Sequence, residues 1–203
     1  MKRILTLGAA FMMAAALMVG CSSSNKGTEE TNKVADQTYP LTINDKEIIV
    51  GETTIGTLIE DGFKITVTEK TEDGQYETIE ISPEMEMEAN SYYSGGNLRL
   101  GDVIYANISL VTDEESVQMK DAVIGRLELS LTGANIDTSS ISLAGVPVAE
   151  LTREKADEVF QGFTGDDYVK IQYGDEYKTL LDFDQESGLI EGINLEKIYD
   201  VDW

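Results

Sequence analysis

Apolar and polar residues alternate along most of the chain beyond residue 63. In 64–69 (KITVTE) Ile65 and Val67 share one side, and in 103–110 (VIYANISL) Ile104, Ala106 and Ile108 do so. The same alternation recurs in 76–81, 123–131, 168–173, 177–184 and 189–195. A period of two with polar residues opposite apolar ones is typical of antiparallel strands whose sheet has one covered face. The pattern therefore predicts antiparallel sheet over most of the chain.

Two shorter segments have helical spacing instead. In 53–63 (TTIGTLIEDGF) Thr53 is placed to cap a helix whose apolar stripe includes Leu58, and in 151–163 (LTREKADEVFQGF) Thr152 is placed in the same way. Both segments end in Gly-Phe, at 62–63 and 162–163, about 100 residues apart. We therefore predict an α+β fold of two tandem units, each an antiparallel sheet with one short helix. The turn-rich stretch 132–140 divides them into 39–132 and 133–203.

The first twenty residues have the composition of a targeting segment. Lys2 and Arg3 precede a long apolar run that ends in small residues, as in a signal peptide. A transmembrane helix is the alternative, since about 20 apolar residues can span a bilayer. No cluster of Lys or Arg follows the run, which favours the signal peptide.

The end of this apolar run resembles the lipobox of bacterial lipoproteins, in the stretch LMVGC (17–21). The resemblance implies cleavage between Gly20 and Cys21, a diacylglycerol thioether on the Cys21 sulfur, and an acylated α-amine such as a palmitoylated one. It places the protein on the extracytoplasmic face of the cell membrane. Residues 21–38 are polar and too poor in large apolar side chains to fold, so we expect a flexible tether between the lipid and a fold that begins near Tyr39.

The charge of the chain excludes several partners. It carries 38 Asp and Glu against 15 Lys and Arg, a formal charge of −23, and removal of Lys2 and Arg3 with the signal peptide makes it −25. Nucleic acid needs Lys and Arg for its phosphates, so we expect no nucleic-acid partner. Anionic headgroups would also repel the folded part. Membrane contact is therefore expected only through the lipid on Cys21.

Missing residue types exclude several chemistries. The chain has no His, which excludes histidine triads, histidine acid–base catalysis and histidine metal sites. Its single Cys cannot form an intramolecular disulfide. No phosphate-binding glycine loop is present, and we predict no cofactor and no catalytic residue. A pair of carboxylates acting on a cell-surface glycan remains as an alternative.

Two stretches invite a binding function. Residues 182–193 (DFDQESGLIEGI) begin like a calcium loop, but Ser187 and Ile193 stand where Gly and Glu are needed, so we predict a plain hairpin turn and no metal ligands. Calcium binding at another acidic cluster stays open. Tyr92 and Tyr93, beside Gly95-Gly96, are candidate partner-binding residues, since Tyr is common at recognition surfaces. Packing at a strand end is the other interpretation of this pair.

Two resemblances bear on function. The run from Gly51 through Leu58 to Gly62-Phe63 resembles a short motif of lipoproteins from clostridial-type bacteria. The second unit distantly resembles the small α/β repeats of outer-membrane-assembly lipoproteins and β-lactamase-inhibitory proteins. They imply a binding or structural role. We therefore expect a non-catalytic lipoprotein that binds a protein or another component of the cell envelope, whether Gram-positive or Gram-negative; a solute-binding lipoprotein is a further alternative.

Overall fold

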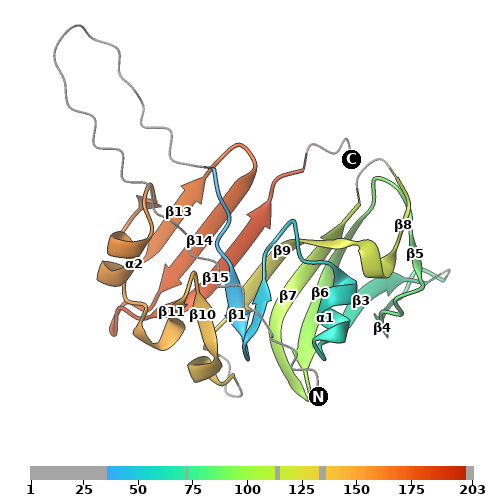
Figure 1. Ribbon diagram of the computed structural model, residues 1–203, viewed down its shortest axis with the longest axis horizontal. Helices are drawn as coiled ribbons and strands as arrows, with labels where there is room; N and C mark the ends of the chain where they lie inside the picture. The colour runs from blue at the N-terminus through green and yellow to red at the C-terminus, as the bar shows by residue number, and fades with distance from the viewer. Residues whose placement is uncertain (1–35, 72, 113–114, 133–135, 200–203) are drawn as a thin grey trace, which may run out of the picture. The chain divides into compact units, whose positions relative to one another are not determined.

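A long antiparallel sheet organises the described part of the protein, as the ribbon in Figure 1 shows. The computed structural model describes residues 36–71, 73–112, 115–132 and 136–199, which belong to one unit that begins at Lys33. The predicted signal peptide, the cleavage position Gly20, the lipidation position Cys21 and nearly all of the tether lie outside the described residues.

Nine strands make up this sheet, and every neighbouring pair is antiparallel. In order across the sheet they are β12 (Thr164–Gly165), β13 (Val169–Tyr173), β14 (Tyr177–Phe183), β15 (Ile190–Lys197), β9 (Val123–Ser130), β7 (Val103–Val111), β6 (Tyr92–Leu100), β3 (Lys64–Lys70) and β4 (Tyr76–Glu80). The prediction of mostly antiparallel sheet with few helices is confirmed. The chain crosses from one half of this sheet to the other at the pairing of β9 with β15.

One predicted face needs correction. Ile104 does not lie with Ala106 and Ile108, because the register of β6 on β7 shifts between Leu98 and Arg99. Ala106 and Ile108 are buried, whereas Ile104 is exposed. A bulge adds one residue to a strand, and so moves the side chains beyond it to the other face.

A second, four-stranded sheet forms from two hairpins. One hairpin consists of β1 (Leu41–Ile43) and β2 (Lys46–Ile48), and the other of β10 (Ile141–Leu143) and β11 (Val146–Pro147). The hairpins join through antiparallel pairing of β1 with β10, so that segments 100 residues apart lie side by side. Each turn has two central residues with positive φ, the geometry that matches the twist of a tight hairpin.

Two short α-helices follow the hairpins. These are α1 (Ile55–Glu60) and α2 (Arg153–Val159). Thr152 caps α2 as predicted, but the cap of α1 is Thr54, so the prediction of Thr53 is wrong by one residue. The Thr53 hydroxyl instead accepts a hydrogen bond from the backbone N–H of Ile49, at 2.8 Å. The remaining elements are β5 (Glu86–Met87), which pairs with β8 (Val117–Gln118), and the 3-10 turns Met119–Asp121, Thr138–Ser140 and Val148–Glu150.

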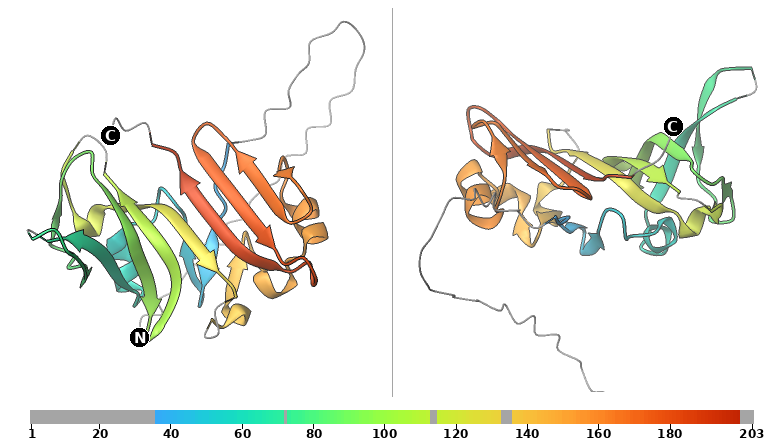
Figure 2. Two further views of the ribbon diagram at one scale, coloured as in Figure 1. Left: turned by 180° about the vertical axis from the view of Figure 1, so that it is seen from behind. Right: turned by 90° about the horizontal axis from the view of Figure 1, so that it is seen from above.

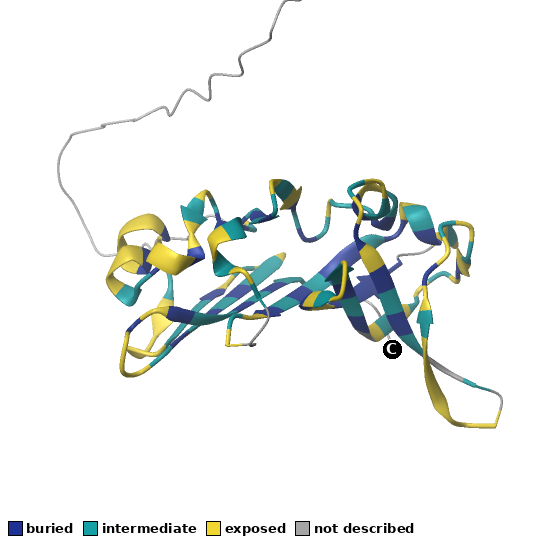
Figure 3. Cartoon of the chain, turned by 90° about the horizontal axis from the view of Figure 1, so that it is seen from below, coloured by how far each residue is buried: buried dark blue, intermediate teal, exposed yellow. Residues whose placement is uncertain are grey.

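The hairpins and helices cover one face of the nine-stranded sheet, as the view from above shows (Figure 2). Leu41, Ile43 and Leu58 from this layer are fully buried against sheet residues such as Leu127 and Leu195. The buried side chains form one cluster that runs beneath both halves of the sheet. The outer surface of the covering layer is exposed, most visibly along α2 (Figure 3). Among the described residues, no element covers the opposite face of the sheet.

Candidate functional site

The uncovered face of the nine-stranded sheet, called the open face below, carries the outward-pointing residues of each strand. In β9 Leu127 and Leu129 are buried in the core, so Arg126 and Glu128 point to the open face. In β15 the same alternation buries Leu195 and turns its neighbours outward. The strand alternation that fills the core therefore also builds a polar surface.

Three polar side chains are linked at the centre of the open face. The Arg126 guanidinium donates to the Glu128 carboxylate through Nη2 and to Asn194 Oδ1 through Nε, at 3.4 Å for the second. The Asn194 amide donates to the same Glu128 oxygen at 3.2 Å. Ion pairs of such exposure stabilise a fold by only about 0–1 kcal/mol, so the effect of this cluster is to hold three polar groups in place.

A transverse row of polar groups crosses the open face next to this cluster. Register places Lys178 opposite Glu196, Glu196 opposite Arg126, and Arg126 opposite Ser109. At one end of the row the Tyr92 hydroxyl donates to Ser109 Oγ at 2.8 Å. At the other end Lys178 lies 5.8 Å from the centre of the Tyr173 ring. The row thus alternates donors and acceptors between two tyrosines.

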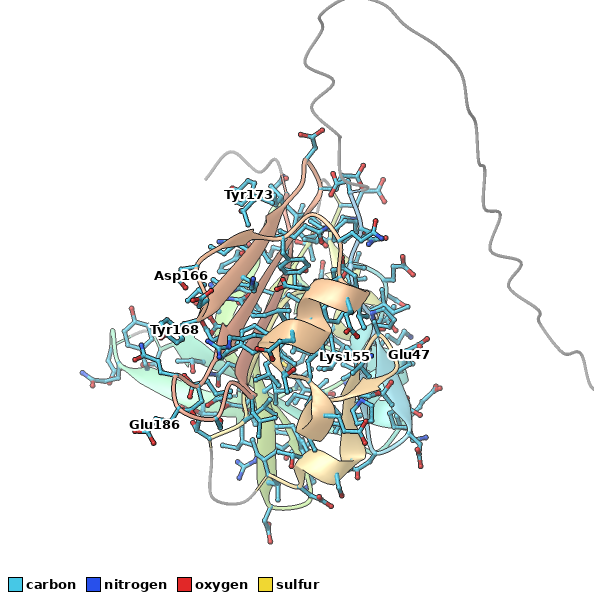
Figure 4. All side chains as sticks on the ribbon, turned by 90° about the vertical axis from the view of Figure 1, so that its left-hand side faces the viewer. Glu47, Lys155, Asp166, Tyr168, Tyr173 and Glu186 are labelled. Atoms are coloured by element: carbon cyan, nitrogen blue, oxygen red, sulfur yellow. The ribbon has the colours of Figure 1, made fainter. Side chains whose placement is uncertain are left out.

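Charge is distributed unequally between the sheet and its covering layer. The nine strands of the sheet hold seven basic and seven acidic residues. Residues 36–62 and 136–163, which include the hairpins and helices, hold eleven acidic residues against three basic ones. Figure 4 shows Glu47 and Lys155 on the helix and hairpin side, away from Tyr173 on the strands. The strands of the sheet are therefore balanced in charge, whereas the covering layer is acidic.

The first of two depressions in the open face lies where β9 begins and β15 ends. It has a volume of about 410 Å³ and is lined by Tyr92, Val111, Gly125, Arg126, Glu196, Lys197, Ile198 and Tyr199. Gly125 is the extra residue of a β-bulge opposite Ser109 and Leu110. A Cβ on Gly125 would lie 2.5 Å from Val111 Cγ2 and 3.3 Å from Tyr199, so only glycine leaves this space open.

The second depression lies at the other end of the same two strands. It has a volume of about 460 Å³, and its lining includes Asn107, Glu128, Ser130, Thr132, Leu180, Asp182, Glu191, Gly192 and Asn194. The Asp182 carboxylate lies over Gly192, where it would be 3.1 Å from a Cβ on that residue. Burial raises the pKa of Asp182 above its ordinary value. The two depressions therefore differ in the sign of the charge that surrounds them.

The predicted partner-binding tyrosines separate onto opposite faces. Tyr92 lies on the open face and lines the first depression, whereas Tyr93 is partly buried against the core. Tyr93 therefore packs at the strand as one interpretation expected, and partner binding stays a prediction for Tyr92. Strand alternation requires the separation, because consecutive residues of a strand point to opposite faces.

The stretch compared with a calcium loop forms the turn between β14 and β15, as predicted. The Asp184 carboxylate accepts hydrogen bonds from the N–H groups of Glu186 and Ser187 and from the Ser187 hydroxyl. These hydrogen bonds, above all those from Ser187, lower the pKa of Asp184. Across the described ranges, no group of three or more acidic or Cys residues is arranged to hold a metal ion. Within the same ranges, no helix has the length and apolar character needed to cross a membrane.

Sequence patterns did not single out Arg126, Glu128, Asn194 or Lys197, and they considered Asp182 only as the first position of a calcium loop. Only the pairing of β15 with β9 and β14 brings these residues together. No protein family, curated protein or solved structure matches the chain. The function therefore has to be argued from this geometry.

Proposed function

We propose that this protein is a lipid-anchored, extracytoplasmic binding module of the cell envelope, and that it acts without catalysis through its open face. One observation carries the proposal: a chain of formal charge −23 has one sheet face that is uncovered, hollowed and balanced in charge. A lipid on Cys21 holds the module at the membrane, and the acidic covering layer stays in solvent.

The size of the open face suits a protein partner. Nine strands about 4.8 Å apart span roughly 40 Å, and six residues of strand span about 20 Å, which gives about 800 Å². A stable protein–protein interface buries about 800 Å² on each partner. The exposed Tyr92 and Tyr173 and the half-buried Arg126 are of the types that dominate binding energy at such interfaces.

We also propose that the fold consists of two tandem copies of one unit: a hairpin, a helix and a four-stranded meander. Matching strands are then β3 with β12, β6 with β13, β7 with β14, and β9 with β15, which lie at mirrored positions in the sheet order. Each helix is preceded by a capping Thr that bridges to the start of the last strand of its unit, Thr54 to Val123 and Thr152 to Leu189. In this interpretation β4, β5 and β8 are additions to the first copy.

Two pairs of matching backbone hydrogen bonds support the duplication. The N–H of the first helical residue donates to a carbonyl just before the last strand, from Ile55 to Ala122 and from Arg153 to Gly188. A return bond starts one residue after the position that bridges to the capping Thr and ends one residue before that Thr. These bonds run from Ile124 to Thr53 in the first half and from Ile190 to Leu151 in the second. The same pair of bonds therefore occurs at the same place in both halves.

A carboxylate-dependent enzyme acting on a surface glycan is the second candidate. Asp182 has a raised pKa and shares the second depression with Glu128 and Glu191, which are the requirements for a general acid and a second carboxylate. We favour binding because Glu128 is tied to Arg126 and Asn194, and cannot turn to a substrate without breaking those contacts. Release of reducing sugar from wall glycans that is lost in Asp182→Asn would replace the binding proposal with the enzymatic one.

The binding proposal is tested by capture from envelope extracts with three versions of the full chain. These are the wild type, an open-face variant (Tyr92→Ala with Arg126→Gln), and a variant of the covering layer (Val159→Ala with Lys155→Gln). Val159 and Lys155 are exposed residues of α2 and lie outside both depressions. We expect one envelope component to bind the wild type and the covering-layer variant and to be lost from the open-face variant. Equal capture by all three, with circular dichroism unchanged, would refute the use of this face.

The lipid anchor has a separate test. Cys21→Ala removes the sulfur that would carry the lipid, so we expect the protein to leave the membrane fraction or to keep its signal peptide. Normal processing of Cys21→Ala together with retention in the membrane would contradict the anchor. Cys21→Ser has nearly the same volume as the wild-type residue and should behave like the Ala variant.

A further inference from the structure

The two depressions of the open face lie end to end along the seam between β9 and β15. The first is lined by the start of β9 and the end of β15, and the second by the start of β15 and the end of β9. The linked side chains of Arg126, Glu128 and Asn194 stand between them. The two depressions are together called the seam trough below.

The seam trough has opposite charge at its two ends. Arg126 and Lys197 line the first depression together with one acid, Glu196. Three carboxylates, those of Glu128, Asp182 and Glu191, line the second, which has no basic lining residue. A basic end is unexpected in a chain with this excess of acidic residues, and its positive charge attracts an anionic group.

Both cations of the basic end keep hydrogen-bonding capacity. Arg126 uses Nε and Nη2 for its contacts, which leaves Nη1 without a hydrogen bond to the described residues. Lys197 lies 5.3 Å from the centre of the Tyr199 ring and forms no ion pair within the described ranges. Arg126 and Lys197 therefore both have donors left for a carboxylate in the first depression.

The middle of the trough offers amides. Asn194 and Asn107 stand on either side of Glu128 in the strand register. A primary amide both donates and accepts, which is what a peptide group requires of a neighbour. Asn107 makes no side-chain hydrogen bond to the described residues and is exposed. Its amide is thus available to a ligand.

The length of the trough limits the size of the ligand. The distance along β15 from Gly192 to Lys197 is five residue steps, or about 17 Å of strand. An extended peptide of about five residues has the same length. A free amino acid is too short to reach both ends, and a folded domain is too wide to enter them.

We propose that the seam trough binds a short extended peptide with free ends, its carboxylate beside Arg126 and Lys197 and its ammonium beside Asp182 and Glu191. This assignment rests on the proposed binding function and gives its ligand a chemical class. The Tyr92 and Tyr199 rings border the carboxylate end, and Leu180 lies at the ammonium end. The paired backbone of β9 and β15 offers no hydrogen bonds of its own, so side chains do all the recognition.

The test is calorimetric titration of the full chain, solubilised from membranes, with three forms of pentaalanine. One has both ends free, one is N-acetylated, and one is C-amidated. Loss of one exposed charge contact should weaken binding about fivefold to tenfold in each blocked form. Equal affinity for the three forms, or no binding of any of them, would overturn the assignment of a dipolar peptide, as would preferred binding of a neutral chitin oligosaccharide.

Charge-neutral variants identify which end of the trough meets which end of the peptide. Arg126→Gln with Lys197→Gln removes both positive charges of the basic end, and should make the free and C-amidated peptides bind alike while N-acetylation still weakens binding. Asp182→Asn with Glu191→Gln should have the converse effect. Lys155→Gln, on the other side of the molecule, is the control and should change neither preference. A charge-neutral variant that lowers the affinity for all three peptides equally would overturn the assigned polarity. If the wild type does not bind pentaalanine but still captures an envelope component through its open face, this inference is refuted and the proposed binding function stands.

Discussion

The two faces of the nine-stranded sheet are built by the same strands but differ in composition and packing. On the covered face, alternate residues such as Leu127 and Leu195 are buried under hairpins and helices. On the open face, the residues between them form ion pairs, amide contacts and two depressions. The covered face therefore supplies most of the stability of the fold, and the open face is available for the binding function that we propose.

The largest expected difference between the faces is in packing. Leu58 of α1 is fully buried, so Leu58→Ala should lower the free energy of unfolding by about 2–5 kcal/mol. Leu180 of β14 is half-buried on the open face, and Leu180→Ala should cost about 1 kcal/mol or less. Urea denaturation of the two variants measures both values. Equal costs would mean that something in the native protein covers Leu180.

Gly125 is an exception to this rule, because it lies in the open face and should still be sensitive to substitution. Gly125→Ala should lower the free energy of unfolding by about 1–3 kcal/mol, because the new Cβ would lie 2.5 Å from Val111 Cγ2. Gly192→Ala, at the other depression, is the milder counterpart, because the nearest atom is the Asp182 carboxylate oxygen at 3.1 Å and that side chain can turn. Thermal denaturation ranks the two. A harmless Gly125→Ala would indicate that the bulge adjusts and that the first depression does not depend on glycine.

Polar residues give a smaller contrast. The Thr152 hydroxyl accepts the backbone N–H of Lys155 at the start of α2, so Thr152→Ala should cost about 1 kcal/mol. Arg126→Gln removes an exposed ion pair on the open face and should cost less than about 0.5 kcal/mol. Denaturation in low and high salt checks the second value. A cost for Arg126→Gln above that of Thr152→Ala would make the central cluster a structural feature rather than a binding one.

The two faces also differed in how far the sequence predicted them. Period-two alternation identified the strands, and the Gly-Phe pairs identified both helices, because each signal is local. The cap of α1 was misplaced by one residue, since Thr53 and Thr54 are both capping types and only the pairing of Thr53 with β9 decides between them. Ile104 was placed on the wrong face because a bulge gives no sequence signal at that position.

The seam trough could not be predicted from local sequence patterns. Arg126 and Asn194 are 68 residues apart and meet only because β9 pairs with β15. Tyr92 was found as a recognition type of residue beside glycines, but its partner Ser109 and its neighbours in the depression were not. Side-chain type predicts which residues can bind, whereas strand order decides which of them act together.

The smallest expected effect distinguishes two acids that are two residues apart. Burial on the open face raises the pKa of Asp182, and Ser187 lowers that of Asp184 in the adjacent turn. A raised pKa means that the folded state binds the proton more tightly than the unfolded state, so Asp182 costs stability as the pH rises above the ordinary range of Asp. Asp182→Asn should therefore raise the melting temperature at pH 7 and change it little at pH 3.

Asp184 should respond with the opposite sign. Its lowered pKa contributes stability above the ordinary pKa of Asp, which is lost as the pH falls through the folded value, so Asp184→Asn should lower the melting temperature at pH 7 and matter less at pH 3. Melting curves of both variants at the two pH values provide the comparison. If Asp182→Asn destabilises the protein at pH 7, that carboxylate already has a cationic partner in the fold. The ammonium-binding end of the seam trough would then be occupied by the protein itself, and the peptide would have to bind elsewhere.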